Sequence, residues 1–453
     1  MKKTPLALLL LLSGYGAGAQ VAAPVRKAAR ASTVPAPKQS AVAAATVDPA
    51  NAQRIDQLLE EYTAANRVPG AIALVIRDGK VVYRKAFGLD DVAAKTLLRT
   101  DAIVRIASQT KAVTSVGAML LFEEGKFQLD DPISKYLPAF RNAKVLATFN
   151  PADSTYTTVP ARSEVTIRQL LTHTSGISYP VIGTKEATAI YAKAKIPSGI
   201  GTPTGTLSAS MNALGPLPLF HQPGERFTYG LSVDVLGRLI EVLSGQPLDE
   251  YLRRRIFEPL GMRDTYFYLP TGKQQRLAKL YTEDAAKATA PMQPIGRMVP
   301  DYPKVAGTYF SGGAGLSSTI DDYAVFLQMM LNNGTYHNHR VLKPATVALM
   351  TQNQIGELNQ GDHKFGLGFS ITTTQSANPL GLSEGSYEWG GIFGTTYWVD
   401  PKAKVVALIY TQKYPNTLGR DLAGKFKTAV YQSFLPEAAT STTSTVPAMP
   451  ATK

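Results

Sequence analysis

Ser108 and Lys111 are the residues whose types and spacing best suit covalent chemistry in this chain. They lie in Ser108-Gln109-Thr110-Lys111, and apolar residues continue at helical spacing as far as Gly125. Two residues three apart in a first helical turn share one face, so the amine can reach the hydroxyl. Unpaired backbone N–H groups at a helix N-terminus also favour a developing anion. The spacing predicts a serine nucleophile with a lysine base, and the alternative is an exposed helix start.

A second serine lies in a pattern that is typical of a nucleophile elbow. Gly381-Leu382-Ser383-Glu384-Gly385 matches Gly-x-Ser-x-Gly, which requires a histidine later in the chain. The last histidine is His363, and no strand or helix pattern flanks Ser383. We therefore interpret this segment as a glycine-rich loop.

The composition excludes several other chemistries. With no Cys, the chain has no thiol nucleophile, no disulfide and no cysteine-ligated metal. Two of the five histidines, His337 and His339, flank Asn338 in a polar loop, which indicates exposed side chains rather than a zinc site. No glycine-rich phosphate-binding motif is present. We expect neither a metal nor a cofactor.

The formal net charge of +13 raises the question of a polyanionic partner. Residues 1–47 carry six basic side chains and no acidic one, so nearly half of this charge precedes the body of the chain. No basic run is interleaved with aromatic residues, which argues against nucleic acid. The remaining charge suits contact with an anionic cell envelope, although ordinary solvated surface charge explains it better.

The two ends of the chain differ in composition from its body. Residues 1–19 have a basic start, a short apolar core and a small-residue cleavage site, which predicts a secretory signal peptide. Residues 20–47 form an Ala/Pro-rich linker, and residues 436–453 a disordered tail. No run is long enough for a transmembrane anchor. We expect an exported protein, either periplasmic or extracellular.

The body, residues 48–435, has strand and helix patterns at both of its ends. An amphipathic helix over 50–65 precedes two apolar strands that flank Asp78-Gly79, a strong hairpin signal. A second hairpin and a closing helix end the body. This order predicts an α+β fold in which one antiparallel sheet, flanked by N- and C-terminal helices, is built from both chain ends. The expected α/β lobe comprises 48–111 and about 300–435, and a mostly helical lobe of about 112–300 is inserted into it. The remaining predicted elements are strands over 71–76, 81–87, 395–399 and 405–411 and a helix over 418–434.

Several segments, in the right order, resemble one known superfamily. Ile106–Lys111 matches its first catalytic motif, and Leu170–Gly176 (Leu-Leu-Thr-His-Thr-Ser-Gly) is among its most recognisable stretches. Tyr229 follows Pro-Gly-Glu as in the second motif, and Trp389-Gly390-Gly391 lies where the third belongs. The chain thus resembles the serine beta-lactamase and penicillin-binding-protein superfamily, in particular class C beta-lactamases and family VIII carboxylesterases. A beta-lactamase/transpeptidase-like fold is implied.

The resemblance implies acyl transfer through a covalent acyl-enzyme. Ser108 would attack an ester or amide carbonyl, while Lys111 and Tyr229 move the proton; which of the two is the main base stays open. The backbone N–H groups of Ser108 and Ile392 would hold the oxyanion. His173 lies in a stretch that is structural in this superfamily, so we assign it local hydrogen bonding rather than catalysis.

Two departures from the superfamily pattern bear on the substrate. Trp389 stands where beta-lactamases and peptidases usually carry a lysine that holds the substrate carboxylate. Leu231 replaces the asparagine of the second motif and has no hydrogen-bonding group. Both changes make the pocket more apolar, as in the esterase branch. The expected substrate-binding residues are Trp389, Gly390, Gly391, Phe393 and Leu231.

The leading hypothesis is an exported serine carboxylesterase acting on small or medium acyl esters. Within enzymes, the alternatives are a beta-lactamase or D-alanyl-D-alanine carboxypeptidase, and an acyltransferase in which an alcohol replaces water. A non-enzyme alternative is a catalytically dead sensor of an acyl ligand. The intact set of Ser108, Lys111 and Tyr229 argues against that last reading.

Overall fold

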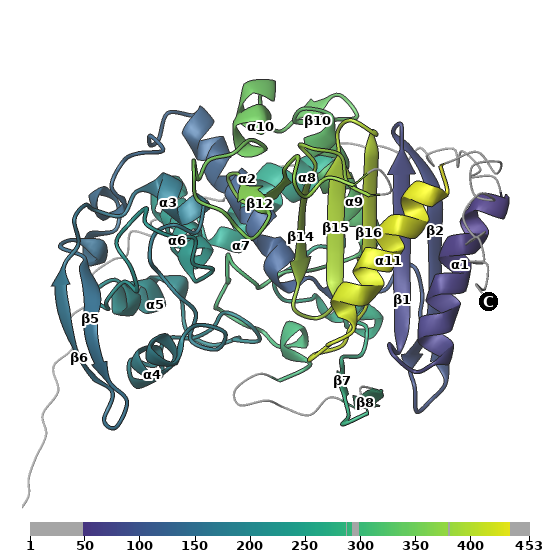
Figure 1. Cartoon of the computed structure of the whole chain (residues 1–453), viewed down its shortest axis with the longest axis horizontal. Helices are drawn as coiled ribbons and strands as arrows, with labels where there is room; N and C mark the ends of the chain where they lie inside the picture. The colour runs from purple at the N-terminus through teal and green to yellow at the C-terminus, as the bar shows by residue number, and fades with distance from the viewer. Residues whose placement is uncertain (1–48, 287, 292–298, 379–380, 435–453) are drawn as a thin grey trace, which may run out of the picture. The chain divides into compact units, whose positions relative to one another are not determined.

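The computed structural model describes residues 49–286, 288–291, 299–378 and 381–434 (Figure 1). The expected signal peptide, linker and tail lie outside these residues. Within the described part of the chain, no helix is long and apolar enough to cross a membrane.

An eight-stranded antiparallel sheet forms the framework of the fold. Strands from the two ends of the body meet in its middle, where Ile72 pairs with Tyr410 and Arg77 with Val405. Asp78 and Gly79 adopt φ values of 50° and 75°, which suit the tight turn between the first two strands. This topology confirms the predicted sheet. In spatial order its strands are β12 (His363–Phe365), β13 (Ser370–Thr372), β14 (Tyr387–Gly391), β15 (Thr395–Asp400), β16 (Val405–Tyr410), β1 (Gly70–Arg77), β2 (Lys80–Asp91) and β3 (Thr96–Leu97).

Two helices from the chain ends cover one face of the sheet. They are α1 (Pro49–Ala64) and α11 (Gly419–Gln432), as predicted, and Figure 1 shows both lying against the strands. Their apolar faces share a core with alternate residues of β1, β15 and β16, because successive side chains of a strand point to opposite faces. The other face of the sheet packs into the main core, together with α9 (Ile320–Leu331).

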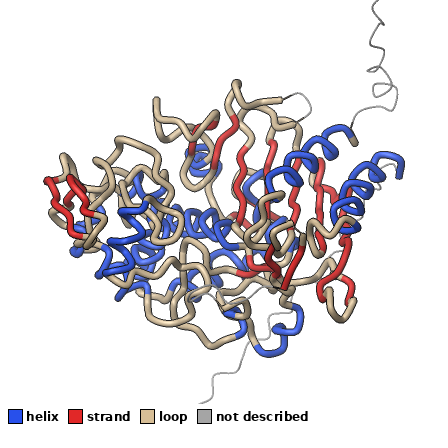
Figure 2. The backbone as a smooth tube through the Cα atoms, turned by 60° about the horizontal axis from the view of Figure 1, so that its bottom comes forward, coloured by secondary structure: helices blue, strands red, loops and turns tan. Residues whose placement is uncertain are grey.

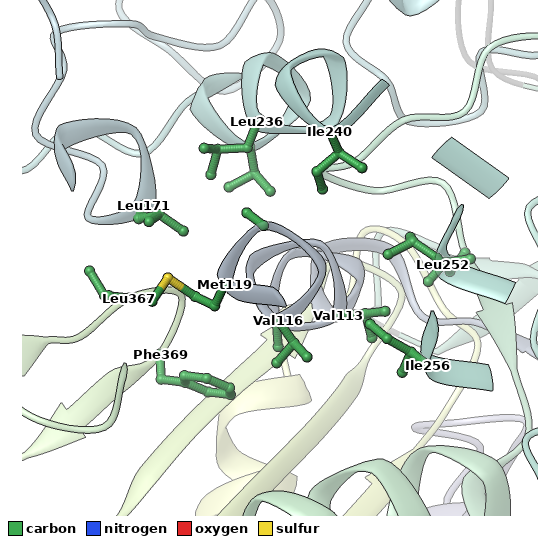
Figure 3. Close-up of a cluster of buried hydrophobic side chains, with 14 of the residues drawn as sticks. Val113, Val116, Met119, Leu171, Leu236, Ile240, Leu252, Ile256, Leu367 and Phe369 are labelled. Atoms are coloured by element: carbon green, nitrogen blue, oxygen red, sulfur yellow. The ribbon is translucent and has the colours of Figure 1, made fainter. Parts of the chain in front are cut away.

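Helix α2 (Thr110–Glu123) runs through the middle of the main core. Its residues from Thr110 to Leu121 are all buried, so it is enclosed on every side rather than amphipathic. Figure 3 shows Leu236 and Ile240 above it, Leu252 and Ile256 to the right, Leu171 and Leu367 to the left, and Phe369 below. A helix enclosed in this way holds its first turn, which begins next to Ser108, in a fixed position.

The region between α2 and α9 is rich in helices and loops, whereas the strands concentrate in the sheet (Figure 2). The hairpin of β5 (Lys144–Asn150) and β6 (Thr155–Pro160) is a feature that the sequence patterns did not predict. Most of its residues are partly or fully exposed, so it lacks the alternation of buried and exposed residues that signals a strand. The other elements of the chain are β4 (Val104–Arg105), β5 (Lys144–Asn150), β6 (Thr155–Pro160), α3 (Ile167–Leu171), α4 (Lys185–Lys193), α5 (Leu207–Leu214), α6 (Ser232–Ser244), α7 (Leu248–Leu252), α8 (Glu258–Leu260), β7 (Tyr281–Glu283), β8 (Thr289–Pro291), β9 (Ser317–Ser318), β10 (Thr335–Tyr336), β11 (His339–Arg340) and α10 (Pro344–Met350).

Candidate active site

Ser108 lies in a short 3₁₀ turn, Ala107–Gln109, between β4 and α2. The α-helix therefore begins at Thr110, two residues after the start that the sequence suggested. Ala107 has a φ of 44°, a left-handed conformation that is uncommon for a residue other than glycine. As the second residue of the turn, Ser108 has a backbone N–H without an acceptor inside the turn. The turn thus presents the hydroxyl at the start of α2, together with an amide that has no backbone acceptor among the described residues.

Lys111 brings its amine to Ser108 from the first turn of α2. Its side chain is buried, and its Nζ lies 3.5 Å from the Oγ of Ser108, as the spacing predicted. The same nitrogen donates to the carbonyl oxygen of Gly313 at 2.7 Å and to the phenol oxygen of Tyr179 at 2.9 Å. An ammonium has three N–H donors for these three oxygens. With two of its positions engaged by Gly313 and Tyr179, the third position on the nitrogen faces Ser108.

Tyr179 is a site residue that the sequence analysis missed. It follows the Leu170–Gly176 stretch by three residues, in a loop without periodicity, so only its place next to that stretch could have drawn attention to it. Burial raises the pKa of Tyr179 well above its usual range, and the nearby charges of Tyr229, Asp234 and Tyr309 act in the same direction. Tyr179 therefore stays a neutral phenol and anchors Lys111.

Tyr229 is held by the stretch that contains His173. The N–H of Thr228 donates to the carbonyl oxygen of His173 at 2.7 Å, and that of Leu231 to Ser178 at 3.3 Å. A Cβ atom at Gly230 would overlap with the carbonyl of Ile177, so glycine lets the two segments lie side by side. The Tyr229 ring centroid is 4.5 Å from the Nζ of Lys111. The structure thus brings Ser108, Lys111 and Tyr229 together.

The ring of His173 packs beneath that of Tyr229. The two centroids are 4.8 Å apart, and Phe227 and Phe365 complete the surrounding cluster. Burial lowers the pKa of His173 well below its usual range, and the charge of Lys111 adds to the effect. Its Nδ1 atom has no hydrogen-bond partner among the described residues. A buried, neutral ring in this position supports Tyr229 and lacks the exposure of a general base.

The Trp-Gly-Gly segment ends strand β14 against the nucleophile turn. A Cβ atom at Gly391 would overlap with the carbonyl oxygen of Ile106, so glycine allows this close approach. Next along the chain, the N–H of Ile392 has no acceptor within the described residues. Trp389 is partly buried, and its indole N–H donates to the phenol oxygen of Tyr229 at 3.4 Å. The predicted oxyanion donors and the aromatic rings of Tyr229 and Trp389 therefore lie together at the end of β14.

Leu231 and Phe393 lie behind the surface of the site. Both side chains have an exposed fraction of 0%. Leu231 precedes α6 in the main core, whereas Phe393 packs with Ala107 and Leu280 in a small cluster of its own. Direct contact between either side chain and a substrate stays a prediction, and in this position they support the residues that face the site.

Asp234 is a second residue that the motifs did not reveal. It is fully buried on α6, and its Oδ1 accepts a hydrogen bond from the Oγ of Ser311 at 2.7 Å. Its Oδ2 lies against Gly313, the residue whose carbonyl binds Lys111. Burial raises the pKa of Asp234 to about 6. A titratable carboxyl thus supports the turn that positions Lys111.

Ser383 is not flanked by the elements that an elbow requires. Residues 381–386 have neither helix nor strand, and the N–H of Ser383 donates to the carboxylate of Asp400 at 3.1 Å. His337 and His339 lie at the tip of the β10–β11 hairpin. Across the ranges that the structure describes, no three His, Asp or Glu residues are placed to hold a metal ion.

This arrangement of nucleophile turn, buried lysine and aromatic wall can be compared with known proteins. The family model described as Beta-lactamase matches residues 55–430. The chain belongs to the beta-lactamase family. An uncharacterized protein of Mycobacterium tuberculosis is 34% identical over 376 residues, which cover 79% of this chain and 89% of that protein.

Other proteins that resemble the chain carry names of activities. Esterase EstB of Burkholderia gladioli is 29% identical over 393 residues, covering 84% of this chain and 95% of EstB. The solved structure of EstCE1, titled a hydrolase with promiscuous acyltransferase activity, has a TM-score of 0.73 at 28% identity. It is matched over 84% of this chain and 98% of its own. At the level of the family, the chain is a serine hydrolase with esterase relatives.

Proposed function

We propose that this protein is a carboxylesterase that hydrolyses uncharged esters through an acyl-enzyme on Ser108. The observation that carries the proposal is the bonding of Lys111. Gly313 and Tyr179 accept two of its N–H groups at 2.7 and 2.9 Å, so the third position faces Ser108 at 3.5 Å. This geometry favours Lys111 over Tyr229 as the base that activates the nucleophile.

In the acylation step, Lys111 takes the proton of Ser108 as the Oγ atom bonds to the carbonyl carbon. The carbonyl oxygen becomes an oxyanion between the N–H groups of Ser108 and Ile392, and such donors contribute about 3–4 kcal/mol each. The carbon–oxygen bond to the alcohol then breaks, and the leaving alkoxide takes the proton back from Lys111 by way of Tyr229. Water attacks the acyl carbon in the same manner, which releases the acid and regenerates Ser108.

The side chains around the nucleophile favour an uncharged substrate. Trp389 offers an indole ring where a lysine would hold the carboxylate of a beta-lactam or peptide, and the ring contacts Tyr229 with centroids 5.4 Å apart. Leu231 has no group that could bind a substrate amide. The site therefore lacks two polar contacts on which beta-lactamase and carboxypeptidase activity would rest.

Acyl transfer to an alcohol is the second candidate function. The partly exposed rings of Tyr229 and Trp389 form an aromatic wall beside Lys111, and the buried ring of Phe365 packs behind Trp389. Such a wall can hold an apolar alcohol against the acyl-enzyme in place of water. EstCE1, whose title names both activities, is a similar protein.

Paired turnover assays test the proposal. The purified protein should hydrolyse p-nitrophenyl butyrate far faster than a chromogenic cephalosporin, and Ser108→Ala should abolish the ester activity. Ser383→Ala is the matched control, because it removes the serine of the Gly-x-Ser-x-Gly pattern and should leave the rate of ester hydrolysis unchanged. Rapid cephalosporin turnover without ester hydrolysis would overturn the proposal, as would an active Ser108→Ala protein.

We also propose that the protein is exported. Support comes from the basic start, apolar core and small-residue cleavage site of residues 1–19. Mass spectrometry of the protein from a bacterial host should find a mature chain beginning at Gln20 in the periplasm or medium. An uncleaved protein confined to the cytoplasm would contradict export.

A further inference from the structure

A small apolar surface adjoins Ser108 and is separate from the aromatic wall. Ala107, the residue before the nucleophile, packs with Leu280 and Phe393 in a buried cluster. Ile200, Ile392 and Tyr414 are partly exposed and pack over this cluster. We call these three side chains the aliphatic patch. Tyr229 and Trp389 belong to the main core instead.

Backbone contacts hold the aliphatic patch in place. A Cβ atom at Gly199 would overlap with the Oγ of Ser311, so the loop that carries Ile200 lies directly against the Ser311–Asp234 pair. On the opposite segment, the N–H of Tyr414 donates to the carbonyl oxygen of Tyr281 at 2.7 Å. The patch is therefore formed before any substrate arrives, and binding there requires little ordering of the protein.

Lys413 is the charged residue nearest to the patch in the sequence, and its ammonium group binds other residues. The side chain of Lys413 is fully buried, and its Nζ donates to the carbonyl oxygen of Arg67 at 2.8 Å and pairs with Glu283 at 3.5 Å. The neighbouring residue Tyr414 can then present an uncharged surface. An apolar substituent suits such a surface, whereas a carboxylate or ammonium would lose hydration there.

The direction of proton transfer decides which part of an ester reaches the patch. The leaving oxygen has to face Lys111 and Tyr229, because they return the proton to it. The carbonyl oxygen lies at the N–H of Ile392, and the acyl substituent takes the remaining direction from the trigonal carbon. We propose that the aliphatic patch of Ile200, Ile392 and Tyr414 binds the acyl chain and selects acyl groups of medium length. This inference rests on the proposed esterase function.

A matched pair of substrate series tests the inference. One series keeps p-nitrophenol and varies the acyl group from acetyl through butyryl to hexanoyl; the other keeps butyryl and varies the alcohol from methyl to hexyl. In the wild type, kcat/KM should rise with acyl length by up to about fourfold per methylene group. Ile200→Ala should lower the ratio of hexanoate to acetate kcat/KM on the order of tenfold. The dependence on alcohol length should not change.

Ile182→Ala is the control, since it is the same substitution in the same insertion at an exposed residue outside the patch. It should retain the wild-type acyl preference. An unchanged hexanoate-to-acetate ratio in a folded Ile200→Ala protein, shown by an unaltered melting temperature, would overturn the inference while leaving the esterase function intact. A changed alcohol series with an unchanged acyl series would also overturn it. Absence of Ser108-dependent ester hydrolysis in the wild type would instead overturn the esterase function, and the inference with it.

Discussion

The Nζ atom of Lys111 donates a hydrogen bond to the phenol oxygen of Tyr179 at 2.9 Å, although the two residues are 68 positions apart in the chain. Tyr179 is fully buried, and its raised pKa keeps it protonated throughout the range in which the enzyme can be assayed. A neutral phenol that accepts from Lys111 fixes the amine without competing for the proton of Ser108. Tyr179 is therefore a positioning residue for the base.

Removing this phenol should slow catalysis more than it unfolds the protein. Tyr179→Phe deprives Lys111 of one acceptor, so the amine samples other positions, and kcat should fall about 10- to 100-fold. The matched control is Tyr191→Phe, which removes another buried phenol; its oxygen accepts from the N–H of Ser178 at 3.3 Å and does not contact Lys111. That control should lose about 1 kcal/mol of stability and little activity. Equal kcat losses in the two variants would contradict the assignment.

Buried carboxyl groups should make stability fall as the pH rises through the acid range. Burial raises the pKa of Asp234 to about 6 and that of Asp322 to about 6. Between about pH 4 and pH 6, the unfolded chain has released these protons and the folded protein still holds them. Each group thus lowers the free energy of unfolding over this window, on the order of 2–3 kcal/mol.

Replacing either carboxyl by an amide should remove that group's loss of folding stability with rising pH. Both Asp234→Asn and Asp322→Asn should melt at a higher temperature than the wild type at pH 8, with little difference at pH 4. Only Asp234→Asn should lower kcat, by about tenfold. Asp234 lies against the turn at Gly313, whose carbonyl oxygen binds Lys111. Its carboxylate also stabilises the ammonium that Lys111 forms during acylation. Thermal melts at both pH values and steady-state assays check this. If Asp322→Asn lost as much activity, the effect would not come from the site.

The parts of the fold that the sequence predicted are those with a clear local pattern, either an amphipathic repeat as in α1 or an unbroken apolar run as in β1 and β16. Helix α1 and the hairpin at Asp78-Gly79 show the periodicity and the turn residues that their burial requires. The β5–β6 hairpin has strand-forming Thr, Val, Phe and Tyr residues but almost no buried face, so it lacks the alternation of apolar and polar residues that indicates a strand. The bounds of the two proposed lobes stay a prediction.

The catalytic roles of Ser108, Lys111 and Tyr229 stay predictions. Ser108 and Lys111 were predictable as neighbours from their spacing, and Tyr229 from the resemblance to a known superfamily. Tyr179 and Asp234 were not, since their contacts with the Lys111 region depend on how distant segments pack. The sequence also suggested that Leu231 binds the substrate; its side chain is fully buried, and direct contact with a substrate stays a prediction. Local patterns identify reacting groups, and tertiary packing decides which groups hold them.

His173 should matter for stability and leave the pH profile unchanged. Its ring supports Tyr229, and its lowered pKa keeps it neutral above the acid range. His173→Asn keeps a residue type that tolerates the φ of 57° found here, but it removes the ring. We expect a loss of about 2–4 kcal/mol in the free energy of unfolding and no shift of the limbs in kcat/KM against pH. Denaturant titration and a pH–rate profile measure the two effects, and a missing limb would restore His173 as a candidate base.

Gly391 should tolerate no side chain without loss of activity. A methyl group there would overlap with the carbonyl oxygen of Ile106 and push the end of β14, with the N–H of Ile392, away from the nucleophile turn. A displacement near 1 Å at an oxyanion donor can cost about 100-fold in rate. Gly391→Ala should therefore reduce kcat by about that factor while Ser108 still reacts with a small fluorophosphonate. Gly272→Ala is the control, because a Cβ atom at Gly272 would meet nothing within 4 Å. Wild-type turnover by Gly391→Ala would show that the N–H of Ile392 does not hold the oxyanion.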